Sequence, residues 1–298
     1  MKFDQLIMFV TVAELGSLSQ ASTRLHKTQP AISQGIRQLE SAFNLALFNR
    51  AGYRLELTEA GKALYQKAAL LLKEASALQQ VATHLSQGNE ASITIAIEAS
   101  FNLKGILPLL ANVQNQFPHT QIIIKQEYIS GAFEAIQHNL ATLCISPTFN
   151  DLQIDPQIDG HFLTNGSLIN VAAPALINRH PKLNSSQMLL NEYQIIVQDS
   201  GKGSKDTEWG VQGGQRRWYV NDFSTKKMLI ENAMGWGKLP DHVAEQSIKN
   251  GTIARLALLD VPNEIPLKYY IMKNKLQPLG PVAQAVWAQF THYTFNQI

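Results

Sequence analysis

The sequence predicts an N-terminal winged helix-turn-helix domain of mainly α structure, a long linker helix and a C-terminal α/β domain. Two short helical segments joined by a tight turn occupy residues 17–43. An apolar heptad without proline follows in residues 58–87. From Ser92 onward, strand-like runs alternate with helical runs, as in α/β domains. A chain of 298 residues is long enough for about two domains of this kind.

The first two helices are predicted from apolar spacing and a capping residue. Residues 3–14 place Leu6, Phe9 and Val10 on one face, so this helix is expected to pack beneath the next two. Ser17 is a preferred N-cap and starts a short second helix with its own apolar side.

The third helix starts at Thr28, which is a preferred N-cap, and tolerates Pro30 because this residue falls in the first turn. Its apolar positions recur at spacings of four, three and four and therefore share one buried stripe. This stripe consists of Ile32, Ile36, Leu39 and Phe43.

The opposite face of the third helix carries side chains that suit the DNA major groove. Gln29, Ser33 and Arg37 lie on successive turns, and Gln pairs with adenine, Arg with guanine and Ser with either base. A solvated polar face explains the same pattern, but the partner helix and the basic hairpin that follows favour DNA binding. The predicted DNA-binding residues are Thr28, Gln29, Pro30, Ser33, Gln34, Arg37, Arg50 and Arg54.

The last two of these residues belong to a predicted wing. Residues 47–50 and 54–57 read as an extended pair, and Gly52 supplies the turn between them. Arg50 and Arg54 are expected to reach phosphates or an adjacent minor groove. A solvated hairpin with two incidental arginines is the alternative.

The linker helix is predicted to form a dimer. Thr58 caps it, and a helix of its length extends about 45 Å, too far to bury its apolar seam on a small domain. We therefore expect the seam to pack against a partner helix, most simply the same helix of a second copy. Packing on the chain's own second domain is the alternative. The predicted dimerisation residues are Leu64, Ala68, Leu71, Ala75, Leu78, Ala82 and Leu85.

The N-terminal pattern resembles the DNA-binding domain of LysR-type transcriptional regulators. The matching residues are Phe9, Ser17, Ala21, Leu25, residues 28–33 (TQPAIS), Ile36, Leu39, Glu40, Leu47, Phe48, Arg50 and residues 57–61 (LTEAG). Leu18, Ser22 and Asn44 depart from the usual residues, and Asn44 is expected to end the third helix in a left-handed conformation. The resemblance implies a transcription factor that binds double-stranded promoter DNA as a homodimer or as a tetramer built from two dimers. RNA polymerase is a further candidate partner.

The C-terminal runs predict a βαβαβ unit with a parallel sheet in residues 93–146. By the same resemblance, the region forms two lobes like those of periplasmic solute-binding proteins. The expected division is a DNA-binding domain at 1–58, a linker helix and hinge at 59–90 and an effector-binding domain at 91–298. Lobe one is expected at 91–162 and 268–298, and lobe two at 163–267.

The resemblance also implies a small-molecule effector between the lobes. Ligands in open α/β sheets bind beyond the carboxyl ends of strands, where several polar residues of this chain fall. For each of them a helix cap or a turn is the alternative role, and Trp236 is either a wall of the cleft or a core residue. The candidate effector-binding residues are Ser100, Asn102, Ile129, Ser146, Gln198 and Ser200.

Several function classes are disfavoured by what the sequence lacks. The formal charge of +2 is weak, and the single Cys144 excludes an intrachain disulfide and a cysteine-based zinc cluster. No apolar run approaches the roughly 20 residues of a membrane span, so we expect a cytoplasmic protein. No catalytic motif was found, so we expect no enzyme activity, no metal and no cofactor other than the effector. The alternatives are a cytoplasmic small-molecule-binding protein or enzyme with a helical N-terminal module, and a DNA-bound regulator without an effector.

Overall fold

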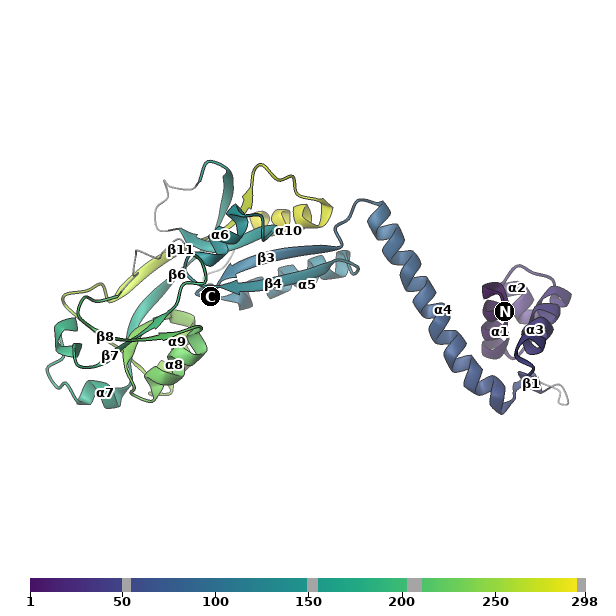
Figure 1. Ribbon diagram of the computed structural model, residues 1–298, viewed down its shortest axis with the longest axis horizontal. Coiled ribbons are helices and arrows are strands. Elements are labelled where there is room, and N and C mark those ends of the chain that lie inside the picture. The colour runs from purple at the N-terminus through teal and green to yellow at the C-terminus, as the bar shows by residue number, and fades with distance from the viewer. Residues whose placement is uncertain (50–54, 149–154, 203–210, 294–298) are drawn as a thin grey trace. The chain divides into compact units, whose positions relative to one another are not determined.

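The computed structural model describes residues 1–49, 55–148, 155–202 and 211–293 and forms two compact units, residues 1–87 and 88–298 (Figure 1). Arg50 and Arg54, which were predicted to bind DNA, lie outside the described residues. The N-terminal unit consists of α1 (Phe3–Leu15), α2 (Leu18–Arg24), α3 (Gln29–Phe43), β1 (Phe48–Asn49), β2 (Glu56–Leu57) and α4 (Glu59–Ser86).

The helix boundaries follow the capping residues of the sequence. The hydroxyl of Ser17 accepts a hydrogen bond from the Gln20 amide at 3.3 Å, and the hydroxyl of Thr28 accepts one from the Ala31 amide at 3.4 Å. Asn44 ends α3 with φ of 54°, so the predicted left-handed C-cap is confirmed.

The N-terminal core holds the first three helices against the start of α4. Ile32, Ile36 and Leu39 of the predicted α3 stripe are fully buried, and Phe43 is half-buried. α1 packs closely on α3 at Gly35, where an added Cβ would lie 2.3 Å from Sδ of Met8. Because the apolar side of α3 is buried in this core, its polar side faces the solvent.

A two-stranded hairpin joins α3 to α4. β1 and β2 pair in antiparallel register, with Phe48 opposite Leu57. The Thr58 hydroxyl then accepts the Gly61 amide at 2.9 Å and caps α4. The start of α4 lies so close to the hairpin that a Cβ on Gly61 would be 2.1 Å from the carbonyl oxygen of Leu47.

The C-terminal unit contains, within the described residues, one mixed sheet of nine strands in the order β4-β3-β5-β11-β6-β9-β7-β8, with β10 paired to β6. Its first elements are β3 (Ser92–Glu98), η1 (Leu103–Ile106), α5 (Leu107–Gln116), β4 (Gln121–Glu127), α6 (Gly131–Gln137), β5 (Leu143–Thr148) and β6 (Ile158–Ala172). The remaining elements are α7 (Pro174–Asn178), η2 (Ser186–Leu189), β7 (Tyr193–Val197), β8 (Arg216–Val220), α8 (Phe223–Glu231), β9 (Trp236–Pro240), α9 (Asp241–Lys249), β10 (Ala254–Arg255), β11 (Glu264–Asn274) and α10 (Pro281–His292).

The predicted parallel unit is confirmed, because β3 runs parallel to both β4 and β5. The middle of the sheet is antiparallel, since β11 pairs with β5 and with β6 in that direction. β6 and β11 are long strands that pair from Ile158 opposite Asn274 to Ile169 opposite Glu264, and they join the two lobes as one sheet. The strand β10, which pairs with the end of β6, is short, at Ala254–Arg255.

Separate apolar clusters cover the two ends of this sheet. In lobe one, α5 and α10 pack on one face through Leu109, Val113 and Val286, and α6 packs on a second cluster through Ile136. In lobe two, α8 and α9 pack against β7 and β9, where Ile230 is fully buried. The strand ends between these clusters are left to line a cavity.

Candidate functional site

The outer face of α3 carries the predicted DNA-binding residues in a solvent-accessible position. Thr28, Gln29, Pro30, Gln34 and Arg37 are exposed. Ser33 is half-buried, and the Thr28 hydroxyl also serves as the helix cap. The face is therefore open to a groove of duplex DNA.

Two neighbouring polar side chains have internal roles. The side-chain Nε2 of Gln5 in α1 donates to the side-chain oxygen of Gln38 at 2.9 Å, so Gln38 helps to hold α1 on α3. Lys27 forms an exposed ion pair with Asp4 at 3.2 Å. No such partner is found for Arg37 within the described residues, and its exposed side chain is available to bases or phosphates.

The predicted seam of α4 divides into two parts. Leu64 and Ala68, near its start, pack into the core of the N-terminal unit. Farther along, Leu71, Leu78 and Leu85 lie exposed at seven-residue spacing, and Leu78 is 71% exposed. Of the remaining seam positions, Ala75 is half-buried and Ala82 is exposed.

An apolar hollow of about 170 Å³ continues this exposed seam at its packed end. It lies between α1, the end of α3 and the first half of α4. Its lining residues are Met1, Leu6, Phe9, Phe43, Leu64, Lys67, Ala68 and Leu71. The hollow and the exposed leucines together form an apolar surface suited to a second helix.

The C-terminal unit contains a cavity of about 100 Å³ among the ends of strands from both lobes. Such a position, beyond strand ends of an α/β sheet, is where small ligands bind. Lobe one contributes Glu98, Ser100, Ile129 and Pro147. The other lining residues are Leu168, Gln194, Ile195, Ile196, Val197, Phe223, Lys226, Lys238 and Leu267.

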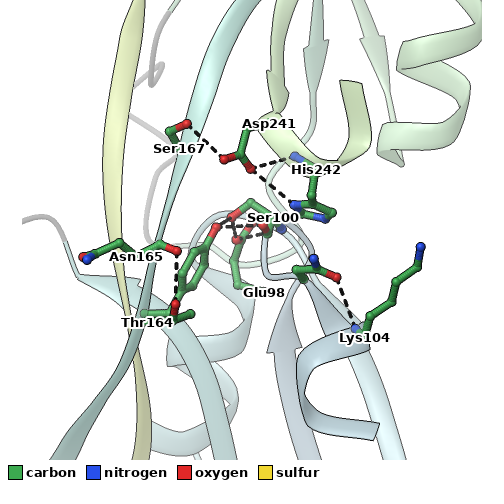
Figure 2. Close-up of polar contacts among 10 residues, drawn as sticks. Glu98, Ser100, Lys104, Thr164, Asn165, Ser167, Asp241 and His242 are labelled. Atoms are coloured by element: carbon green, nitrogen blue, oxygen red, sulfur yellow. Dashed lines mark hydrogen bonds and ion pairs between the residues drawn. The ribbon is translucent and has the colours of Figure 1, made fainter. Parts of the chain in front are cut away.

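Ser100 and Ile129 are the two predicted effector-binding residues that line this cavity. The Ser100 hydroxyl and amide both donate to the carboxyl of Glu98, and the amide distance is 3.0 Å (Figure 2). The Ile129 amide donates to the other Glu98 oxygen at 3.3 Å, from a backbone with φ of 56°. The Tyr269 hydroxyl donates to the Ser100 carbonyl at 2.7 Å.

Burial controls the protonation of this cluster. Desolvation raises the pKa of the Glu98 carboxyl above its usual range, although the hydrogen bonds from Ser100 and Ile129 oppose the shift. Desolvation also raises the pKa of the Tyr269 hydroxyl.

Two lysines line the lobe-two side of the cavity. Lys226 of α8 is 6% exposed and Lys238 of β9 is 9% exposed. Burial, with a smaller effect from the nearby Lys238 charge, lowers the pKa of Lys226 to about 7. Burial likewise lowers the pKa of Lys238.

Sequence reasoning missed both lysines, because lysine is usually assigned to the surface. Two signals were present. Lys226 stands four residues before Ile230 on the apolar face of a helix capped by Asp222, and Lys238 stands within a strand between apolar residues.

The other four candidate effector-binding residues lie away from the cavity lining. Asn102 caps η1, where its side chain accepts the Lys104 amide at 3.2 Å. Ser146 is buried in β5, its hydroxyl donates to the Pro147 carbonyl at 3.4 Å, and Gln198 is exposed at the end of β7. Trp236 is fully buried in a core cluster.

Ser200, the remaining candidate, takes part in a contact between the lobes. Its hydroxyl accepts the Tyr128 amide at 2.8 Å and donates to the Glu127 carboxylate at 2.7 Å. Beside it, the Ser130 hydroxyl donates to Asp199 at 2.7 Å. These hydrogen bonds join the loop before α6 to the loop after β7, and we call them the lobe latch.

A second polar network joins lobe two to the long strands. The Ser167 hydroxyl of β6 donates to Asp241, the first residue of α9, at 3.4 Å (Figure 2). Asp241 also accepts the His242 amide at 2.7 Å. Desolvation lowers the pKa of His242, and the Asp241 carboxylate opposes this shift.

In the part of the chain that the structure describes, no group of three or more His, Cys, Asp or Glu side chains is placed to hold a metal ion. No described helix is both long enough and apolar enough to cross a membrane. Cys144 is fully buried in β5, and burial raises the pKa of its thiol.

Comparison with known proteins matches nearly the whole chain to two family descriptions. Residues 3–62 match the bacterial regulatory helix-turn-helix protein of the lysR family, and residues 86–294 match the LysR substrate binding domain. The HTH-type transcriptional regulator AceR of Acinetobacter baumannii is 28% identical over 273 residues, covering 90% of this chain and 88% of AceR. The uncharacterized regulator YeeY of Escherichia coli is 26% identical over 258 residues, covering 84% and 81%.

Solved structures show the same fold over the full length. CrgA, a LysR-type transcriptional regulator from Neisseria meningitidis, superposes with a TM-score of 0.50 at 18% identity and 98% coverage of both chains. LysG of Corynebacterium glutamicum, solved with arginine as bound effector, gives a TM-score of 0.50 at 20% identity, covering 98% of this chain and 97% of LysG.

Proposed function

The chain belongs to the LysR family of bacterial transcriptional regulators, and we propose that α3 is its reading helix in the DNA major groove. The observation that carries this proposal is the division of α3 into a fully buried apolar stripe and an exposed face. Gln29 and Arg37 have the geometry to pair bidentately with adenine and guanine, while the Thr28 end of the helix approaches the phosphates. Two such helices in a dimer read half-sites about 34 Å apart.

A binding assay on DNA selected by genomic footprinting tests this assignment. Arg37→Ala is expected to weaken binding to the selected site by about 1–3 kcal/mol, and to relax the preference for one base pair. Arg255→Ala removes an exposed arginine of the C-terminal unit and is the matched control. Unchanged gel-shift affinity and unchanged base preference in Arg37→Ala would refute the role of α3.

We propose that the cavity at the strand ends holds the effector. It contains side chains from both lobes, so a ligand there contacts groups whose relative positions differ between lobe arrangements. A regulator without an effector predicts that no small molecule shifts the melting temperature of the intact protein. A ligand-dependent shift that also changes DNA affinity supports the proposal over this alternative.

We further propose that the exposed part of the α4 seam pairs with the same helix of a second copy, giving a homodimer or a tetramer of two dimers. The exposed Leu71, Leu78 and Leu85 support this pairing, because their seven-residue spacing suits a coiled coil. We also propose a cytoplasmic location, contact with RNA polymerase at the promoter and action without catalysis, in keeping with the family assignment. An intact protein that turned over a substrate would favour the enzyme alternative.

A further inference from the structure

The cavity has an uneven distribution of charge. Both of its basic side chains, Lys226 and Lys238, come from lobe two. Glu98 is its acidic lining residue, and the Glu98 carboxyl receives hydrogen bonds from Ser100 and Ile129 of lobe one. The Glu98 carboxyl is thus occupied by hydrogen bonds from its own lobe, and among the described residues it forms no ion pair with Lys226 or Lys238.

Lys226 is held in the cavity without a carboxylate partner among the described residues. Asp222, four residues earlier in the chain, caps α8 by accepting the Thr225 amide at 2.7 Å and the Thr225 hydroxyl at 2.8 Å. The Lys226 ammonium lies 6.0 Å from the centre of the Phe223 ring. A buried ammonium with this environment is costly and calls for an anion.

The backbone of β9 fixes the position of this lysine. A Cβ on Gly237 would lie 3.0 Å from Cε and 3.5 Å from Nζ of Lys226. Glycine at this position therefore leaves room for the lysine side chain. Lys238 follows directly in the same strand and also lines the cavity. Its charge is close enough to contribute to the lowered pKa of Lys226. The fold therefore brings two ammonium groups to one wall.

Apart from Gln194, the rest of the lining is apolar and comes from both lobes and the long strands. The apolar lining residues are Ile129, Pro147, Leu168, Ile195, Ile196, Val197, Phe223 and Leu267. Such a surface binds hydrocarbon and excludes a fully hydrated inorganic ion. A cavity of about 150 Å³ admits benzene, so a volume of about 100 Å³ indicates a ligand of only a few non-hydrogen atoms.

We propose that the effector is a small organic monocarboxylate, bound through its carboxylate by Lys226 and Lys238 and through its hydrocarbon body by the apolar lining. This inference rests on the proposed function, because it names the ligand class of the same cavity. The carboxylate forms charge-assisted hydrogen bonds with the lysines, and Glu98 stays in its hydrogen bonds with Ser100 and Ile129.

Thermal unfolding of the full-length protein with paired probes tests this inference. The probes are propionate and butyrate, each compared with its neutral primary amide at equal concentration and constant ionic strength. At about ten times its Kd, a carboxylate is expected to raise Tm by about 3–6 °C, and its amide by far less. Lys226→Met and Lys238→Met keep the side-chain volume and are each expected to weaken carboxylate binding about ten- to hundredfold. Lys227→Met, on the next position of α8 outside the cavity lining, is the matched control.

The outcomes separate this inference from the proposed function. Equal binding of carboxylate and amide, or binding unaffected by Lys226→Met and Lys238→Met, would overturn the anion assignment. A shift produced by zwitterionic amino acids or inorganic phosphate, but by none of the monocarboxylates, would also overturn it while leaving an effector-controlled regulator in place. The proposed function would fail in a different way: a ligand would bind in the cavity, but the affinity of the protein for DNA would not change.

Discussion

Replacing Lys226 by methionine is expected to stabilise the ligand-free C-terminal unit, with a defined pH dependence. The folded protein holds the pKa of this lysine at about 7, below the usual 10.5. Below pH 7 the group is protonated in both folded and unfolded states, so the full penalty of burying the ammonium applies. Between pH 7 and 10.5 the unfolded chain binds more protons than the folded chain, and stability rises with pH.

The magnitude follows from the two pKa values. Linkage gives a penalty of about 5 kcal/mol at pH 6 and about 1 kcal/mol at pH 9.5, which are upper values because local relaxation reduces them. Lys226→Met is therefore expected to raise the free energy of unfolding by about 2–5 kcal/mol at pH 6, and the gain is expected to shrink by pH 9.5.

Urea unfolding followed by tryptophan fluorescence at both pH values measures this difference. Lys227→Met, which removes a neighbouring charge from the same helix, is expected to change stability little at either pH. Loss of stability in Lys226→Met at pH 6 would refute the reasoning, because it would show that the ammonium is already satisfied in the ligand-free protein.

Two further predictions concern the N-terminal unit. Gly61→Ala places a Cβ 2.1 Å from the Leu47 carbonyl oxygen and is expected to lower the free energy of unfolding of this unit by about 2–4 kcal/mol, measured by urea unfolding. The control is Gly213→Ala, where an added Cβ meets nothing within 4 Å. Leu78→Glu places a charge in the exposed α4 seam and is expected to shift the protein toward monomer in analytical ultracentrifugation, whereas Leu259→Glu at an 86% exposed site of the C-terminal unit is expected to leave the assembly unchanged. A dimer that persists in Leu78→Glu would place the interface elsewhere.

The N-terminal elements could be predicted because local signals determine them. Thr28 and Asn44 mark the two ends of α3 by their own capping chemistry, and the four-three-four spacing decides which face is buried. The pairing of β6 with β11 joins segments about a hundred residues apart, and no local pattern specifies such a register.

Only part of the cavity lining could be predicted from the sequence. Ser100 and Ile129 follow strands, and topology alone brings such residues to the cavity. Lys226 and Lys238 enter it only because α8 packs on β9 at Gly237, which is a tertiary contact. Helix periodicity indicates the buried side of α8. Because lysine is usually found at the surface, this pattern alone does not predict that Lys226 is buried.

The cavity and the lobe latch act on the same separation between lobes. The latch joins Ser130 to Asp199 and Ser200 to Glu127, and each pair has one member in each lobe. A ligand held by Lys226 while packing on Ile129 likewise bridges the two lobes, so its affinity depends on how far apart they stand. Differential affinity of this kind is what a ligand needs in order to shift a conformational equilibrium, and a tenfold preference corresponds to about 1.4 kcal/mol. In the ligand-free protein, burial of the Lys226 ammonium costs free energy. An anion bound there removes this cost and also contacts both lobes. Both effects favour the lobe arrangement in which Lys226 and Ser100 line the same cavity.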